Sequence, residues 1–161
     1  MSRSYAFRIV NVFAESTFGG NPLCVFEDAR GMSDDEMRLL ARQFNLSETT
    51  FILPSETADA HVRIFTPGYE MRFAGHPTLG TAHVLRSLRG LSDNVTLQFA
   101  AGLVPVQAQG DHWTLTLTPI DARLQKVVST ITLEGTRDVL RSVAIRQADG
   151  DHSVMRLQPI R

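Results

Sequence analysis

The sequence predicts an α+β fold, with an antiparallel β-roll or barrel wrapped around a central apolar helix. About seven short segments rich in strand-forming residues occur between residues 5 and 118, and turn residues separate most of them. One further segment, residues 78–88, is apolar on nearly every side when drawn as a helix, which is typical of a buried helix. Several strands around one buried helix favour an α+β class over a repeated strand–helix–strand sheet.

Two strands are predicted to open the chain. Residues 5–13 carry apolar side chains on both faces, as in a strand that is covered on both sides. The segment Phe18-Gly19-Gly20-Asn21-Pro22 then indicates a turn, because its paired glycines allow positive φ. A second strand follows at residues 23–26, where Cys24 between apolar neighbours is expected to be an inert buried thiol.

The first helix is predicted to begin after Ser33. Ser33 and Glu36 have the spacing of a capping box, in which each side chain accepts a hydrogen bond from the other residue's backbone N–H. The apolar residues that follow lie on one side of a helix, so this helix should be amphipathic and lie on the surface of the core. These residues are Met37, Leu40, Ala41 and Phe44.

The second helix and the remaining strands follow in order. Pro77 suits the first position of a helix, because its missing N–H leaves no hydrogen bond unmade there. Strands are predicted at residues 48–53, 61–65, 95–99, 103–108 and 113–118, with a turn at residues 109–112.

The hydrophobic pattern weakens beyond Pro119, which indicates a boundary near residue 120. We therefore expect residues 1–120 to form one lobe and residues 121–161 to form a separate tail. In the tail, residues 135–142 suggest a short helix. The Asp149-Gly150 pair suggests a hairpin turn between two short strands.

Composition excludes several classes of protein. The 161 residues include 16 basic and 17 acidic side chains and show no basic run, so a nucleic-acid partner is not expected. A single cysteine excludes an intramolecular disulfide and fits a reducing compartment. The apolar stretches are shorter than the roughly 18 residues that span a bilayer, so no membrane association and a cytoplasmic location are expected.

Glu48 is the first candidate for chemistry, because it opens an otherwise apolar strand segment. A carboxylate in such a strand is unfavourable unless it faces water or a site. The local sequence leaves both alternatives open: Glu48 lies at an edge in contact with solvent, or it is a catalytic carboxylate.

The second candidate is the segment Gly75-His76-Pro77-Thr78 at the start of the apolar helix. Backbone N–H groups at a helix N-terminus can bind a carboxylate or phosphate, although the same residues also make an ordinary N-cap. The five histidines have no metal-ligand spacing, so no metal site is expected. His83, inside the apolar helix, is predicted to be a hydrogen-bonded core histidine.

Several segments together resemble the PhzF-like family of phenazine biosynthesis, in order and in approximate spacing. The segments are Asn11-Val12-Phe13, Phe18-Gly19-Gly20-Asn21-Pro22, Asn45-Leu46-Ser47-Glu48-Thr49, Arg63-Ile64-Phe65-Thr66-Pro67 and Phe73-Ala74-Gly75-His76-Pro77-Thr78-Leu79-Gly80. The resemblance covers residues 5–118. It implies one lobe of the diaminopimelate-epimerase fold, in which two similar lobes enclose the substrate.

The resemblance also implies an activity, namely cofactor-independent isomerisation of a small carboxylic acid by proton transfer. It implies that Glu48 is the catalytic acid/base and that His76 acts beside it. The residues implied to bind substrate are Asn21, Gly75, Thr78 and Leu79. Related racemases use a thiol at the start of this helix, where the present chain has Ala74, so a two-thiol racemase is not expected.

The family's second lobe has no counterpart that we can identify after Pro119. Two functions are therefore expected: an isomerase that acts through Glu48, or an inactive single lobe that binds carboxylates or supports assembly. A lobe shaped to pack against a partner should expose apolar surface beside its site. We therefore expect a homodimer, in which a second chain could complete the site.

Overall fold

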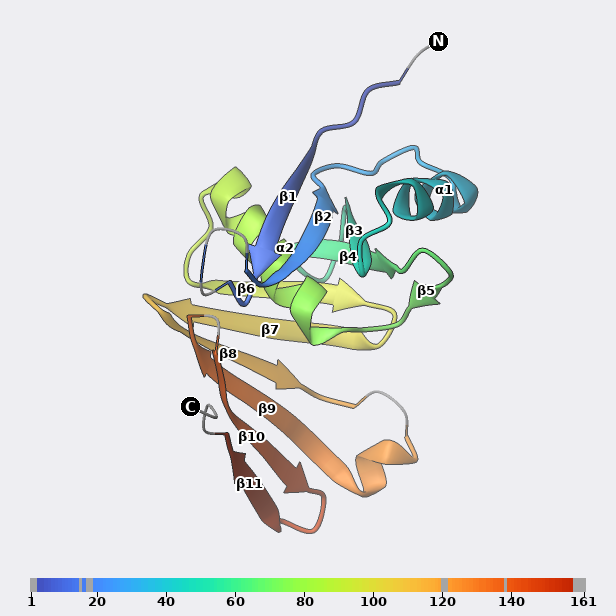
Figure 1. Cartoon of the computed structure of the whole chain (residues 1–161). Coiled ribbons are helices and arrows are strands. Elements are labelled where there is room, and N and C mark those ends of the chain that lie inside the picture. The colour runs from blue at the N-terminus through green and yellow to red at the C-terminus, as the bar shows by residue number, and fades with distance from the viewer. Residues whose placement is uncertain (1–2, 15, 17–18, 120–121, 138, 158–161) are drawn as a thin grey trace.

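One continuous sheet dominates the computed structural model, which describes residues 3–14, 16, 19–119, 122–137 and 139–157 (Figure 1). Within these residues, the sheet has the strand order β1-β2-β3-β4-β6-β7-β8-β9-β10-β11, with β5 beside β4. The strands are β1 (Phe7–Val12), β2 (Asn21–Phe26), β3 (Glu48–Leu53), β4 (Ala60–Phe65), β5 (Glu70–Met71), β6 (Asn94–Phe99), β7 (Gly102–Gln109), β8 (His112–Leu117), β9 (Val128–Thr136), β10 (Val139–Gln147) and β11 (His152–Arg156). The helices are α1 (Asp34–Phe44), α2 (Gly75–Arg89) and a short 3₁₀ turn at Leu124–Lys126. The structure thus confirms the α+β class.

The sheet is mixed and open, so the predicted purely antiparallel barrel is wrong. β2 pairs parallel with β3, and β4 pairs parallel with β6. The physical reason is that α1 connects the first pair and α2 lies between the members of the second, and parallel strands need such a crossover. Among the described strands, β1 pairs only with β2 and β11 only with β10, which leaves the sheet unclosed.

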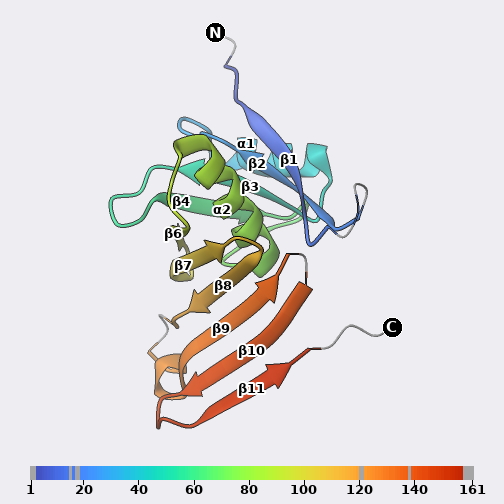
Figure 2. The same cartoon turned by 90° about the vertical axis from the view of Figure 1, so that its left-hand side faces the viewer.

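α2 packs against β1, β2, β3 and β6 (Figure 2). Gly80 shows how close this packing is, because a Cβ atom there would lie 2.6 Å from Leu23 Cδ2 and 2.8 Å from Val12 Cγ2. The helix begins at Gly75 rather than at Thr78, so Pro77 is its third residue and not its first. Proline is tolerated there because the N–H groups of the first turn have no acceptor within the helix.

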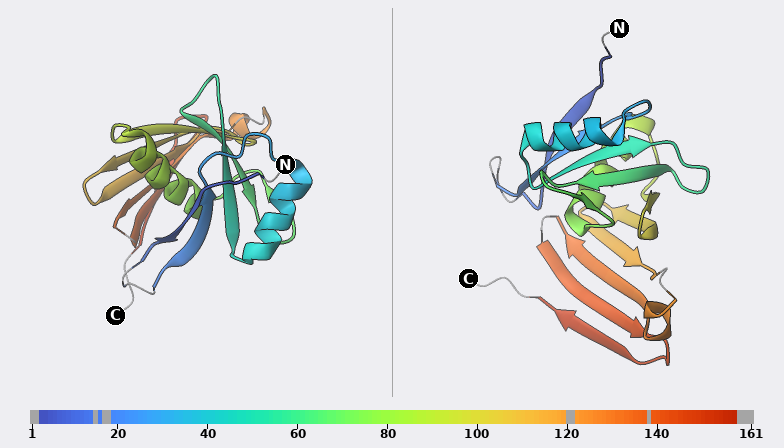
Figure 3. Two further views of the ribbon diagram at one scale, coloured as in Figure 1. Left: turned by 90° about the horizontal axis from the view of Figure 1, so that it is seen from above. Right: turned by 90° about the vertical axis from the view of Figure 1, so that its right-hand side faces the viewer.

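α1 lies on the opposite side of β2–β4 from α2 (Figure 3). The predicted capping box is present, with Ser33 Oγ accepting from the Glu36 N–H and the Glu36 carboxylate accepting from the Ser33 N–H. Met37 and Ala41 of α1 pack with Phe51 in a core cluster of their own. Cys24 is fully buried in the same cluster, as predicted, and burial raises the pKa of its thiol to about 12.

The tail forms three strands that extend the sheet (Figure 2). The short helix predicted at residues 135–142 is wrong, because β9 pairs along β8 and turns at Arg137, whose φ is 53°, into β10. The hairpin predicted around Asp149-Gly150 is confirmed, with a φ of 99° at Gly150. The boundary predicted near residue 120 coincides with residues outside the described set. Within the described residues, no helix has the length and apolar character of a membrane span.

Candidate active site

The candidate site lies where β2, β3 and α2 all begin. Glu48 is the first residue of β3, His76 is the second residue of α2 and Asn21 is the first residue of β2. Because β2 and β3 are parallel neighbours, with Leu23 opposite Glu48, their first residues lie at the same end of the sheet. The topology thus brings together three side chains that are far apart in the sequence.

Gly20 determines where β2 begins. Its φ is 81°, in the left-handed region that favours glycine, and a Cβ atom would lie 2.6 Å from the Val12 carbonyl oxygen. The backbone can therefore pass this close to Val12 only with a glycine at position 20. Asn21, the next residue, is hydrogen-bonded to His76.

His76 is hydrogen-bonded on both ring nitrogens. Its Nε2 lies 3.1 Å from the Asn21 carbonyl oxygen, and its Nδ1 lies 2.9 Å from Glu48 Oε2 and 3.3 Å from Asn21 Nδ2. A carbonyl oxygen only accepts, so Nε2 carries a proton. The contact between Nδ1 and Glu48 then needs one proton, which either group can hold. The carboxylate and the imidazole thus share one hydrogen bond at the start of α2.

Neither group of the pair points into bulk water. The side chains of His76 and Glu48 are 11% and 18% exposed. This low exposure argues against one of the two alternatives that the local sequence leaves open for Glu48, an edge position in contact with solvent. The small exposed fraction leaves room for contact with a small molecule.

The start of α2 offers backbone donors beside this pair. No side chain caps the helix at Ala74. A Cβ atom at Gly75 would meet no atom within 4 Å, so there is open space in front of the first turn. Uncapped N–H groups at the positive end of a helix dipole attract anions. A substrate carboxylate could therefore bind next to Glu48.

Gly75→Val is expected to block this space without unfolding the protein. The branched side chain would project into the open space, and its effect on stability should be at most about 1 kcal/mol, the scale of helix propensities. Titration with sulfate, followed by NMR shifts of the residue 75 and His76 amides, should show at least a tenfold loss of affinity. Gly68→Val is the matched control, because an added Cβ atom there would meet only Thr66 Oγ1, at an ordinary contact distance of 3.9 Å. Unchanged sulfate binding in Gly75→Val would show that the anion binds elsewhere.

The other two residues predicted to bind substrate lie away from the pair. Thr78 is fully buried, and its Oγ1 donates to the Ala74 carbonyl at 2.7 Å, as does its backbone N–H at 3.3 Å. Leu79 lines a cavity on a different side of α2. Asn21 thus contacts the Glu48–His76 pair and Gly75 precedes His76 in α2, whereas Thr78 is hydrogen-bonded within the helix and Leu79 lines another cavity.

The prediction that His83 is a hydrogen-bonded core histidine is wrong, because its side chain is exposed. It lies on a side of α2 that faces the gap between β1 and β8, where no strand covers the helix. The hydrogen bond from His76 to the Asn21 carbonyl could not be inferred either, since it depends on the backbone path after Gly20. Among the described residues, no group of three His, Cys, Asp or Glu side chains could hold a metal ion.

Comparison with known proteins finds isomerases among the relatives of this chain. The chain is 54% identical over 106 residues to an uncharacterized isomerase of Pasteurella multocida, covering 65% of the chain and 37% of the relative. It is 42% identical over 102 residues to the trans-2,3-dihydro-3-hydroxyanthranilate isomerase of Pseudomonas aeruginosa, covering 63% and 36%. The chain thus spans little more than a third of the length of these relatives.

Solved structures show the same fold. A PhzF-family protein of Enterococcus faecalis superposes with a TM-score of 0.66 at 27% identity, covering 81% of this chain and 55% of that one. A hydroxyproline epimerase of Agrobacterium vitis, at 15% identity and a TM-score of 0.52, shares the fold alone. Residues 10–129 match the profile of the family described as phenazine biosynthesis-like protein, PhzC-PhzF. Its ordered motifs, its fold and this match together show that the chain belongs to the PhzC-PhzF family.

Proposed function

We propose that the chain is an isomerase that moves a proton between two carbons of a small carboxylic acid, with Glu48 as the acid/base. The observation that carries the proposal is the hydrogen bond between Glu48 Oε2 and His76 Nδ1 at 2.9 Å. A positioned carboxylate with such a partner is a competent general acid and base. The named activity of the Pseudomonas aeruginosa relative, an isomerase of trans-2,3-dihydro-3-hydroxyanthranilate, supports the same class of reaction.

The proposed reaction balances without another reactant. The ionised Glu48 carboxylate removes a proton from one carbon of the substrate, the electron pair shifts along the substrate, and Glu48 returns the proton to a second carbon. The Nε2–H group of His76 donates to the Asn21 carbonyl throughout, and Nδ1 stabilises the Glu48 carboxylate. Side chains alone supply this chemistry, so we propose that it needs no cofactor. We also propose a cytoplasmic location for the chain, which its single, fully buried cysteine, Cys24, supports.

The proposed substrate carboxylate binds at the first turn of α2, within reach of Glu48. We also propose that β1–β8 and α2 form one wrapped lobe, the first of the two that the family fold implies. A single lobe exposes its site on one side. We propose that a second copy of the chain completes the site.

A second copy is proposed to cover one face of β9–β11. Four registered positions on successive strands form an apolar row on this face, namely Leu115, Leu133, Val143 and Met155. Leu115 is fully buried in the core, whereas Met155 is 62% exposed, so the core face continues into solvent. Two copies of the chain together have about the length of one Clostridium acetobutylicum relative, half of which the chain covers.

Met155→Lys is expected to convert the dimer into a monomer, because a charge in the apolar row would be desolvated on association. Sedimentation equilibrium over a concentration series should give twice the 17.9 kDa chain mass for the wild type and a single chain mass for the variant. Val154→Lys is the matched control, since Val154 is 51% exposed and lies on the opposite face of β11. A wild-type chain that stays monomeric would contradict the proposed dimer.

The second candidate function is a carboxylate-binding module without turnover, which the uncapped first turn of α2 supports. One experiment separates the two. The purified chain is incubated in D₂O with trans-2,3-dihydro-3-hydroxyanthranilate, and deuterium at the substrate carbons is followed by NMR. Incorporation above the uncatalysed rate supports the isomerase. Binding without incorporation supports the module.

A further inference from the structure

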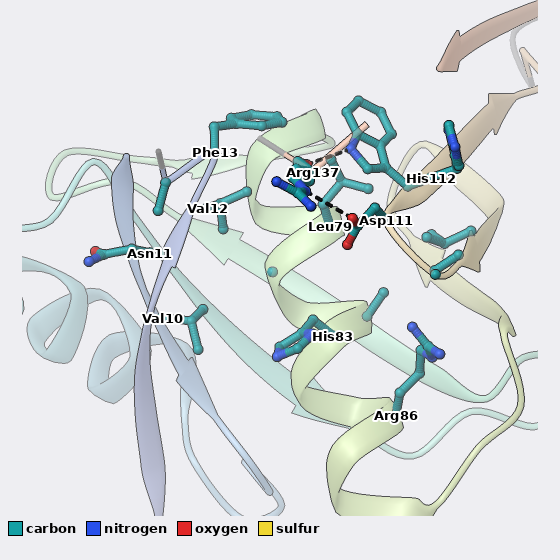
Figure 4. A pocket seen from close by; sticks show the side chains of 17 residues that line it. Val10, Asn11, Val12, Phe13, Leu79, His83, Arg86, Asp111, His112 and Arg137 are labelled. Atoms are coloured by element: carbon teal, nitrogen blue, oxygen red, sulfur yellow. Dashed lines mark hydrogen bonds and ion pairs between the residues drawn. The ribbon is translucent and has the colours of Figure 1, made fainter. Parts of the chain in front are cut away.

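A cavity of about 630 Å³ lies apart from the candidate active site (Figure 4). It opens between β1, one side of α2 and the β7–β8 hairpin. Its walls are mainly apolar and include Val10, Val12, Phe13, Leu79, Ala82 and Val106. Glu48, His76 and Asn21 do not line it. This volume is within the range of small-molecule sites, which are typically apolar with a few converging polar groups.

Two nitrogen-bearing side chains reach this cavity from successive turns of α2. His83 is exposed and makes no hydrogen bond or ion pair with any described residue. Arg86 donates from Nη2 to Asp93, while its Nε is buried and has no hydrogen-bond partner among the described residues. Because this Nε is closed off from the cavity as well as from bulk water, the N–H groups that Arg86 can offer to a ligand are those at the end of its guanidinium.

The remaining charged groups around the cavity are engaged with one another. The Asp111 carboxylate accepts from Arg137 Nε at 2.8 Å, and Trp113 Nε1 donates to the Arg137 carbonyl at 2.9 Å (Figure 4). His112 Nδ1 lies 3.2 Å from Thr136 Oγ1. His83 and Arg86 lie on the α2 side of the cavity, opposite the aromatic rings of Phe13 and Trp113, whose centroids are 6.0 Å apart.

We propose that this cavity binds a monocarboxylate with a flat apolar body. The carboxylate would accept from Arg86 and His83, and the ring would lie against the apolar walls near Phe13 and Trp113. Because Asp93 already neutralises the Arg86 guanidinium, this side of the cavity lacks the excess positive charge that a phosphate dianion needs, which favours a singly charged carboxylate. This second site is independent of the isomerase activity proposed for Glu48.

Benzoate is the probe, and benzamide is its uncharged counterpart of nearly the same shape. Trp113 is the only tryptophan, so its indole N–H gives one unambiguous signal in ¹⁵N-labelled chain. Benzoate should shift this signal and bind at least tenfold more tightly than benzamide. Arg86→Gln should weaken benzoate at least tenfold and leave benzamide unchanged. His83→Ala, an exposed position that folding does not need, should weaken benzoate about threefold.

Asp93→Asn is the matched control, because it removes the same ion pair and keeps the guanidinium. It should bind benzoate as tightly as the wild type or more tightly. Glu48→Gln should not change this binding, which separates the second site from the proposed active site. Benzoate shifts centred on the Gly75 and His76 amides, or equal affinities of benzoate and benzamide in wild type, would overturn the proposal. An affinity that neither Arg86→Gln nor His83→Ala lowers would overturn it too.

Discussion

Glu48→Gln is expected to lower solvent-deuterium incorporation by about 10² to 10⁴-fold, the range that general acid–base groups contribute. The glutamine amide keeps the shape of the side chain but cannot accept a proton from carbon. Because the side chain still reaches His76, the free energy of unfolding should change by no more than about 1 kcal/mol. The measurement compares initial exchange rates by NMR with urea unfolding curves of both chains.

Glu27→Gln is the matched control for this substitution. The Glu27 side chain is 23% exposed and pairs with Arg8, so the change removes a similar, partly buried carboxylate elsewhere in the protein. Its exchange rate should equal that of the wild type. If Glu48→Gln exchanges deuterium at the wild-type rate, Glu48 is not the base.

Phe51→Ala should cost about 3 to 5 kcal/mol of stability, the usual range for a buried phenylalanine. Phe51 is fully buried in β3, stacks on Phe26 with ring centroids 4.9 Å apart, and contacts Phe65 edge-on at 5.5 Å. The lost ring would leave a cavity beneath α1 that rigid neighbours cannot fill. Urea unfolding, followed by far-UV circular dichroism, measures the change.

Phe51→Leu separates packing volume from other effects at this position. It keeps most of the apolar volume and should cost about 1 to 2 kcal/mol, clearly less than alanine. A loss below 1 kcal/mol in Phe51→Ala would show that the cluster beneath α1 contributes little to folding. Since β3 also begins with Glu48, partial unfolding here should reduce deuterium exchange in parallel with the folded fraction.

The elements that the sequence predicted well depend on neighbours within one or two turns of chain. The Ser33–Glu36 capping box, the strand Glu48–Leu53 and the Asp149-Gly150 hairpin turn all occur as expected. The signal for each element lies within a few residues: a capping pair for the helix, a hydrophobic pattern for the strand and turn residues for the hairpin. The motifs around Glu48 and His76 also indicated the family, because the order of the motifs can be read directly from the sequence.

The errors concern pairings between distant segments. The parallel pairs β2–β3 and β4–β6 depend on where a helix returns the chain to the sheet, and no local pattern encodes that. The tail was predicted to contain a short helix at residues 135–142, yet pairing of β9 with β8 draws these residues into strands. Exposure of His83 likewise reflects the absence of a strand between β1 and β8.

By itself, the sequence determined the class of fold, most element positions and the candidate residues Glu48 and His76. Only the tertiary structure decided that Asn21 joins them, that Thr78 and Leu79 lie apart, and that the sheet stays open. The physical reason is the range of the interactions. A helix cap is complete within four residues, whereas the hydrogen bonds of His76 join it to Glu48, 28 residues away, and to Asn21, 55 residues away.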